Sequence, residues 1–186
     1  MGNAATKGWF KLEGQDGDRT LDQQLVGLDL LLDGVSGKTV LDLGCAEGLI
    51  SMELARAGAK HVHGVDALDR YIKHAKKHAG EWPVSFEKGN LNDDRNIAPE
   101  YEYDIVLMLA ICHKLTDPTK FATRYGKLAR EFVVVRLPPA TAPVVADRRS
   151  GNKRHDIQAA LRTVGFQLTN VFYGTYNEWN GYFHRV

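Results

Sequence analysis

The sequence predicts a doubly wound α/β fold: a seven-stranded sheet, mostly parallel with an antiparallel C-terminal hairpin, and helices on both faces. Two observations predict it. From residue 39 onward, short apolar stretches alternate with helical stretches, which is typical of βαβ units and of a parallel sheet. The last two apolar stretches are separated only by GTYNEWNG, which is too short for a crossover helix, so these two strands should pair antiparallel.

The chain begins with an arm and a helix. Residues 1–18 are rich in Gly, Lys and Asp, and we expect an irregular N-terminal arm there. A capping box follows, in which the Thr20 hydroxyl accepts from the first helical turn while Gln23 reaches back to the cap. Leucines then recur at helical spacing, so we expect a helix over residues 21–33 that ends near Gly34.

Strands and helices alternate through the rest of the chain. The stretch DIVLMLAI, residues 104–111, is continuously apolar, as expected of a central strand that is covered on both faces. Gly58, Gly80 and Gly165 favour the ends of the helices that precede them. The predicted strands are residues 39–43, 61–65, 84–88, 104–111, 132–136, 167–173 and 182–186. The predicted helices between them are residues 49–57, 69–78, 118–130 and 154–164.

Length and composition predict a single domain over residues 1–186, with 44% hydrophobic and 25% charged residues. The net charge of +1 gives no argument for a nucleic-acid partner. Cys45 and Cys112 are too few for a disulfide framework and lack metal-ligand spacing, so we expect small core residues and no metal. No apolar stretch has the length of a membrane span and the N-terminus lacks a signal-peptide core, so we expect a cytoplasmic protein, monomeric or weakly dimeric.

The first strand of the alternation runs into a glycine-containing turn, VLDLGCAEG, and then a helix. Gly44 permits a tight turn and lets a ligand approach the backbone, and Gly48 stands where the helix begins. Cys45 and Ala46 occupy positions where a dinucleotide-binding turn needs glycines, so this turn is less suited to bind a pyrophosphate. Asp42 adds a carboxylate that suits a cationic aminoacyl group. These features favour S-adenosylmethionine over NAD.

The ends of the next two strands add further polar groups. Asp66 lies about twenty residues after the turn, the usual offset of an acid that accepts hydrogen bonds from ribose hydroxyls. Asn90 can hydrogen-bond an adenine edge, and the Leu91 N–H can donate to a ring nitrogen. The ends of three strands therefore provide a glycine-containing turn, a carboxylate that can accept hydrogen bonds from a ribose, and a segment that can hydrogen-bond an adenine.

With these residues the chain resembles the class I S-adenosylmethionine-dependent methyltransferases, including their small-molecule and wobble-uridine-type groups. The resemblance covers residues 35–186 and lies in VLDLGCAEG, GVDALDRYIKHAKKH, GNLND and YDIVLMLAICHKLTDP. The closing antiparallel hairpin is also that family's topological mark. The family usually has an aspartate at the position of Asn90, so this chain departs from the family's pattern there. The expected cofactor-binding residues are Asp42, Gly44, Cys45, Ala46, Gly48, Asp66, Ala67, Asn90, Leu91 and Leu109.

Candidate residues for catalysis and for the acceptor follow the fourth and fifth strands. His113 comes directly after the fourth strand, where an imidazole could take a proton from an acceptor hydroxyl or amine; alternatively it shapes the loop. Residues 137–153 form a long basic loop whose Arg148 and Arg149 could bind an acidic substrate or a phosphate; alternatively this loop is only solvated. Before the first helix, Trp9 and Phe10 could form a lid over the cofactor with Arg19 near the carboxylate of its methionine part; alternatively, Trp9 and Phe10 pack against the edge of the sheet.

Several functions stay open on these grounds. The first is an enzyme that transfers a methyl group from S-adenosylmethionine to an O or N atom of a small molecule. The basic loop would favour an anionic molecule. The second is an RNA methyltransferase. A third is a non-catalytic S-adenosylmethionine-binding protein that acts through a partner. An NAD-dependent oxidoreductase comes last, because the turn lacks the middle glycine.

Overall fold

A computed structural model describes residues 8–11, 17–93, 102–139 and 153–186. The strands are β1 (Gly8–Phe10), β2 (Gly17–Arg19), β3 (Thr39–Leu43), β4 (His61–Asp66), β5 (Val84–Lys88), β6 (Tyr103–Leu109), β7 (Ala129–Leu137), β8 (Phe166–Tyr173) and β9 (Trp179–Arg185). The helices are α1 (Leu21–Leu25), α2 (Asp29–Gly34), α3 (Leu49–Arg56), α4 (Asp69–His78), α5 (Pro118–Gly126) and α6 (Arg154–Thr163), with a short 3₁₀ turn, η1 (Cys112–Lys114).

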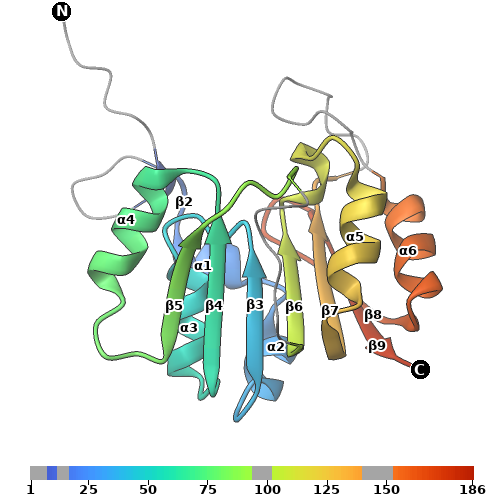
Figure 1. Ribbon diagram of the computed structural model, residues 1–186, viewed down its shortest axis with the longest axis horizontal. Coiled ribbons are helices and arrows are strands. Elements are labelled where there is room, and N and C mark those ends of the chain that lie inside the picture. The colour runs from blue at the N-terminus through green and yellow to red at the C-terminus, as the bar shows by residue number, and fades with distance from the viewer. Residues whose placement is uncertain (1–7, 12–16, 94–101, 140–152) are drawn as a thin grey trace, which may run out of the picture.

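Within these ranges the chain forms a seven-stranded sheet in the order β5-β4-β3-β6-β7-β9-β8 and a separate pair, β1-β2 (Figure 1). The strands from β5 to β7 run parallel, and β9 pairs antiparallel with both β7 and β8. The predicted fold class is therefore confirmed. The strand order reverses between β3 and β6, and in such sheets a ligand binds beyond the carboxyl ends of the strands at that point.

The central strand β6 is covered on both faces, as its continuous apolar sequence predicts. Val106 and Met108 pack in a cluster with residues of α5 and α6, whereas Ile105 and Leu107 pack in a cluster with residues of α2 and α3. Side chains alternate between the two faces because a strand has a period of two residues. Figure 1 shows these two groups of helices on opposite sides of the sheet. No helix in the described part of the chain is long and apolar enough to cross a membrane.

The predicted helix over residues 21–33 is in fact two short helices, because the chain turns at Gly27, whose φ is +79°. The predicted capping box is present: the Gln23 N–H donates to the Thr20 hydroxyl at 3.2 Å, and the Thr20 N–H donates to Gln23 Oε1 at 3.0 Å. The Tyr182 hydroxyl donates to the Gly27 carbonyl at 2.9 Å. The turn thus depends on a contact with β9 that the local leucine pattern does not contain.

A buried arginine fixes this corner to the sheet. Arg136, near the end of β7, is 1% exposed. Its guanidinium donates to the carbonyl oxygens of Gln24 at 2.8 Å and Val26 at 3.1 Å, and to Asn180 Oδ1 at 2.6 Å. Burial lowers its pKa to about 10, so the group stays charged at neutral pH. The segment before β3 is therefore held over the ends of β7 and β9.

Other boundaries also differ from the prediction. Part of the arm expected to be irregular forms β1 and β2, which pair parallel with Phe10 opposite Arg19. The predicted helix over residues 118–130 ends at Gly126, and β7 already begins at Ala129. Similarly, β9 begins at Trp179 rather than Tyr182, because Trp179 pairs with both Leu137 and Tyr173. Most of the predicted basic loop lies outside the described residues.

Candidate functional site

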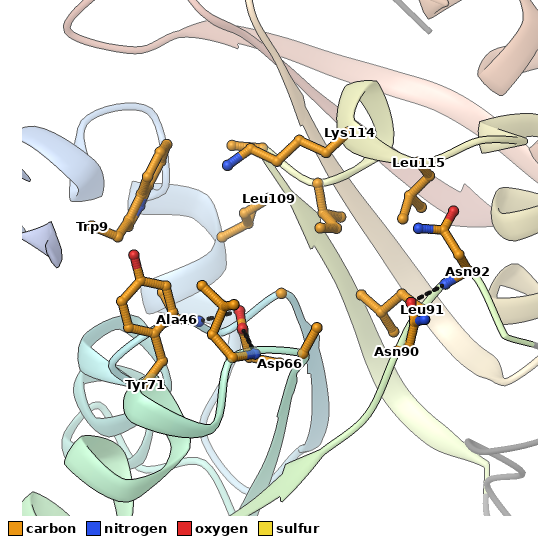
Figure 2. A pocket seen from close by; sticks show the side chains of 15 residues that line it. Trp9, Ala46, Asp66, Tyr71, Asn90, Leu91, Asn92, Leu109, Lys114 and Leu115 are labelled. Carbon is orange, nitrogen blue, oxygen red and sulfur yellow. Dashed lines mark hydrogen bonds between the residues drawn. The ribbon is translucent and has the colours of Figure 1, made fainter. Parts of the chain in front are cut away.

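A cavity of about 240 Å³ opens at the carboxyl ends of β3, β4, β5 and β6, where the strand order reverses. Figure 2 shows its lining, with Asp66 and Tyr71 on one side and Asn90, Leu91 and Asn92 on the other. Its walls include seven of the ten predicted cofactor-binding residues, namely Gly44, Ala46, Asp66, Ala67, Asn90, Leu91 and Leu109. The three strand ends singled out in the sequence therefore meet at one place.

The turn after β3 forms the floor of this cavity. The N–H groups of Gly44 and Cys45 both donate to the Val65 carbonyl, at 2.7 and 3.1 Å, which fixes the turn against β4. Gly44 has a φ of +82°, and a Cβ built there would lie 3.1 Å from the Ile111 side chain. Glycine is thus required both for the left-handed backbone and for the space beside Ile111. Ala46 is also left-handed, with a φ of +48°.

Asp66 lies at the end of β4 and is held by two backbone donors. The Ala46 N–H donates to its Oδ2 at 3.1 Å, and the Leu68 N–H donates to its Oδ1 at 2.9 Å. Burial raises the pKa of this carboxyl, while those hydrogen bonds and the charge of Lys114 act in the opposite direction. Each carboxylate oxygen can accept more than one hydrogen bond, so Asp66 can still accept from ligand hydroxyl groups.

The opposite side of the cavity is formed by the segment after β5. The Asn92 N–H donates to Asn90 Oδ1 at 3.1 Å, and the Thr116 N–H donates to Asn92 Oδ1 at 2.9 Å. The first bond, seen in Figure 2, closes a turn within the segment, and the second ties the segment to the loop after β6. Asn90 therefore lines the cavity from a fixed turn, and Leu91 and Leu109 provide apolar surface beside it.

Three of the predicted contacts do not line this cavity. Asp42 is 2% exposed and accepts a hydrogen bond from the Ser51 hydroxyl at 2.6 Å, and burial raises its pKa to about 6. Cys45 packs in a small cluster with Phe86, and burial raises the pKa of its thiol. Gly48 has a φ of +78°, and a Cβ there would lie 2.6 Å from the Phe86 ring. In this structure Asp42, Cys45 and Gly48 support the turn after β3 by packing and hydrogen bonding beneath the cavity lining.

A second cavity of about 340 Å³ adjoins the first and contains His113. It is bordered by the β1-β2 pair, by the loop after β6 and by the turn between β8 and β9. His113 itself is 5% exposed. Trp9, Ala110 and Lys114 border both cavities, so they mark the junction between them. Ala110 has a φ of +55°, a backbone strain of the kind found at functional sites.

The β1-β2 pair brings an arginine and an aromatic ring to the second cavity. Arg19 makes an ion pair with Glu178, and its guanidinium carbon lies 4.5 Å from the Tyr176 ring centroid and 5.4 Å from that of Trp9. Burial raises the pKa of Glu178, but its hydrogen bonds, including those from Tyr176 and Arg19, outweigh this effect and hold the pKa below its usual value. The ion pair is therefore formed at neutral pH.

Several lining residues were not predicted to contact the cofactor, notably Tyr71, Asn92 and Lys114. Asn92 falls within GNLND and could have been found from its place just after β5. Lys114 and Tyr71 carry no comparable signal, because a basic or aromatic side chain near a strand end is common. Arg148 and Arg149 lie outside the described residues. Among the described residues, no cluster of three or more His, Cys, Asp or Glu could hold a metal ion.

Comparison with protein families and curated sequences gives a consistent picture. Residues 40–130 match a family described as "Methyltransferase domain". The chain is 32% identical over 111 residues to a ubiquinone biosynthesis O-methyltransferase from Nitrosomonas europaea, covering 55% of this chain and 44% of that protein. It is 30% identical over 128 residues to a protein of the same name from Aeromonas salmonicida, covering 66% of this chain and 52% of that protein. The chain thus spans about half the length of these curated relatives.

Solved structures share the fold. The magnesium protoporphyrin IX methyltransferase from Synechocystis PCC 6803, with bound S-adenosylhomocysteine, has a TM-score of 0.73 at 20% identity and covers 89% of this chain and 84% of its own. An S-adenosylmethionine-dependent methyltransferase from Mesorhizobium loti has a TM-score of 0.70 at 17% identity and covers 85% of this chain and 95% of its own.

Proposed function

We propose that the chain is a class I methyltransferase that transfers a methyl group from S-adenosylmethionine to an oxygen or nitrogen atom of a small molecule; the match of residues 40–130 to a methyltransferase domain and the fold shared with solved methyltransferases support this. The observation that carries this proposal is the pair of adjoining cavities. One is lined by the residues expected to bind the donor, the other contains His113, and they meet at Ala110 and Lys114. A donor and an acceptor can therefore lie side by side, as direct transfer requires.

The residues of the first cavity fit S-adenosylmethionine. Asp66 is placed to accept from the ribose hydroxyls, and the Asn90 amide with the Leu91 N–H to meet the adenine edge. The space beside Ile111 that a side chain at Gly44 would fill is left open for the ligand. When bound, S-adenosylmethionine supplies a methyl group that its sulfonium charge already activates. The protein then has to align the acceptor, exclude water and remove a proton.

In this proposal His113 removes that proton. Its position in the second cavity lets the imidazole accept a proton from an acceptor hydroxyl or amine. The relatives named as O-methyltransferases favour an oxygen acceptor. A small molecule fits a cavity of about 340 Å³. Arg148 and Arg149, which lie outside the described residues, remain predicted acceptor contacts.

We also propose a cytoplasmic location. Cys45 and Cys112 are both buried in the core and form no disulfide with one another, which suits a reducing compartment.

Transfer of a labelled methyl group tests the proposal. The protein is incubated with methyl-labelled S-adenosylmethionine and, separately, with a small-metabolite extract and with total RNA. We expect label in the small-metabolite fraction. Label found only in RNA would favour the RNA methyltransferase, and label in neither pool, with binding of S-adenosylmethionine intact, would favour the non-catalytic protein.

The role of His113 is tested by His113→Ala. We expect turnover to fall at least tenfold with binding of S-adenosylmethionine unchanged, because the imidazole acts on the acceptor and not on the donor. His155→Ala, which removes an exposed histidine of α6, is the matched control and should leave turnover unchanged. Turnover near the normal value in His113→Ala would remove His113 from the mechanism.

A further inference from the structure

Glu47 lies in the turn after β3, between Ala46 and Gly48, and is buried, with 1% of the residue exposed. Its Oε1 accepts a hydrogen bond from the backbone N–H of Trp9 at 2.9 Å. The two residues are 38 positions apart in the sequence, so this bond joins the turn to β1. Burying a carboxylate costs free energy unless hydrogen bonds or opposite charges replace its lost hydration, and the Trp9 N–H is one such donor.

The bond connects two parts of the wall of the first cavity. Ala46, next to Glu47, lines this cavity from the turn, and Trp9 borders both cavities from β1. Figure 2 shows Trp9 on the same side of the cavity as Ala46 and Tyr71. Glu47 itself lines neither cavity. It can therefore influence a ligand through the groups that it holds in place or through its charge.

Two further contacts hold the β1-β2 pair at other places. Phe10 is 1% exposed and packs in the cluster that contains residues of α2 and α3. Arg19, at the end of β2, makes the ion pair with Glu178 beside the second cavity. These contacts remain when the Glu47 side chain is changed, so the pair should stay in place as a whole. Glu47 is thus placed to fix Trp9 against the turn rather than to hold the fold together.

We propose that Glu47 is a positioning residue that holds Trp9 over the junction of the two cavities by accepting its N–H. This role rests on the proposed function, in which the methyl group passes through that junction. A covered junction keeps water away from the reacting atoms and slows the release of the donor. Without the hydrogen bond, β1 moves away from the turn, and both the affinity for the donor and turnover fall.

The position of Trp9 is tested first, in the protein without a ligand. Labelling with 5-fluorotryptophan gives one fluorine resonance each for Trp9, Trp82 and Trp179, and Trp9→Phe assigns the first. Glu47→Met removes the acceptor oxygen at similar volume, whereas Glu47→Gln keeps an acceptor oxygen without the charge. We expect Glu47→Met to shift or broaden the Trp9 resonance and to leave the other two in place. Glu47→Gln should reproduce the wild-type spectrum.

Other spectra would overturn the proposal. A Trp9 resonance that Glu47→Met leaves in place would show that the bond does not position this residue. Equal changes in Glu47→Met and Glu47→Gln would assign the effect to the charge instead. If all three resonances move in Glu47→Met, Glu47→Ala is measured by the same criteria. Movement of all three in both variants would show that Glu47 holds the whole fold, which also contradicts a positioning role.

Binding of the donor and of its product provides the second test. S-adenosylmethionine and S-adenosylhomocysteine are titrated calorimetrically into the wild type, the two Glu47 variants and Glu81→Met, a control that removes an exposed carboxylate between α4 and β5. We expect Glu47→Met to weaken both compounds at least fivefold, and Glu47→Gln and Glu81→Met to change them less than twofold. Weakening of S-adenosylmethionine alone in both Glu47 variants would show that the charge acts on the sulfonium, and would overturn the proposal.

Turnover with saturating donor completes the test, with the acceptor found in the labelling experiment. It should fall at least fivefold in Glu47→Met and stay within twofold of the wild type in Glu47→Gln. Affinity and turnover that Glu47→Met leaves unchanged would overturn the role of Glu47. A wild type that binds neither compound would contradict the proposed function, and the role of Glu47 toward the donor with it, even where the Trp9 resonance behaves as expected.

Discussion

At the scale of single residues, burial gives neighbouring carboxyl groups different tasks. Asp42 and Asp66 end adjacent parallel strands, β3 and β4, and both have raised pKa values. Asp42 is covered by α3 and bonded to Ser51, whereas Asp66 borders the cavity with its oxygens held by backbone N–H groups. The sequence predicts a cofactor contact for each; Asp66 lines the cavity, whereas Asp42 does not.

The buried carboxyl of Asp42 makes stability depend on pH. Its pKa is about 6 in the folded protein and near 3.9 in an unfolded chain. A raised pKa contributes stability that is fully present below the unfolded value and is lost as pH rises through the folded value. Asp42→Asn, which keeps an acceptor for Ser51, should gain about 2–3 kcal/mol in unfolding free energy relative to the wild type between pH 4 and pH 7.5.

Urea unfolding of the ligand-free protein at both pH values measures this gain. Asp33→Asn, at an exposed position on α2, is the control and should show no such pH dependence. A difference between Asp42→Asn and the wild type that is the same at both pH values would contradict this account of Asp42.

At the scale of elements, the strand ends could be predicted and the turns between packed elements could not. Apolar stretches and glycines locate β3 to β6, so the sequence brings Gly44, Asp66 and Asn90 to one edge. The break at Gly27 depends instead on hydrogen bonds from Arg136 and Tyr182, more than a hundred residues later. Trp9 and Lys114 meet only because β1 packs near the loop after β6. Such contacts leave no local pattern.

Gly48, which joins the turn after β3 to α3, allows a prediction about the stability of the protein. Gly48 and Gly37 both have a positive φ, of +78° and +73°, but a Cβ at Gly48 would meet Phe86 at 2.6 Å whereas nothing lies within 4 Å at Gly37. Gly37→Ala should cost only the strain of the left-handed backbone, about 1–2 kcal/mol. Gly48→Ala should cost about 1–3 kcal/mol more, because Phe86 must move. Chemical denaturation measures both, and equal losses would refute the crowding at Gly48.

At the scale of the whole molecule, the sheet carries the first cavity at its switch point, and segments that are far apart in the sequence complete the second cavity. The β1-β2 pair supplies Trp9 and Arg19, and the β8-β9 turn supplies Tyr176 and Glu178. The ion pair between Arg19 and Glu178 joins these two segments. Arg136, on β7, holds the end of α1 through hydrogen bonds to the carbonyl groups of Gln24 and Val26. The fold thus builds the second cavity, where we propose that the acceptor binds, from elements that are far apart in the sequence.

The central claim is that the cavity beside Gly44 and Asp66 binds S-adenosylmethionine, and calorimetric titration tests it most directly. S-adenosylmethionine, S-adenosylhomocysteine, NAD and ATP are each titrated into the wild-type protein and into Asp66→Ala. We predict that the first two bind at least a hundredfold more tightly than NAD or ATP, and that Asp66→Ala weakens them at least tenfold because the ribose loses its acceptor. Preference for NAD, or binding of S-adenosylmethionine that Asp66→Ala leaves unchanged, would contradict the claim.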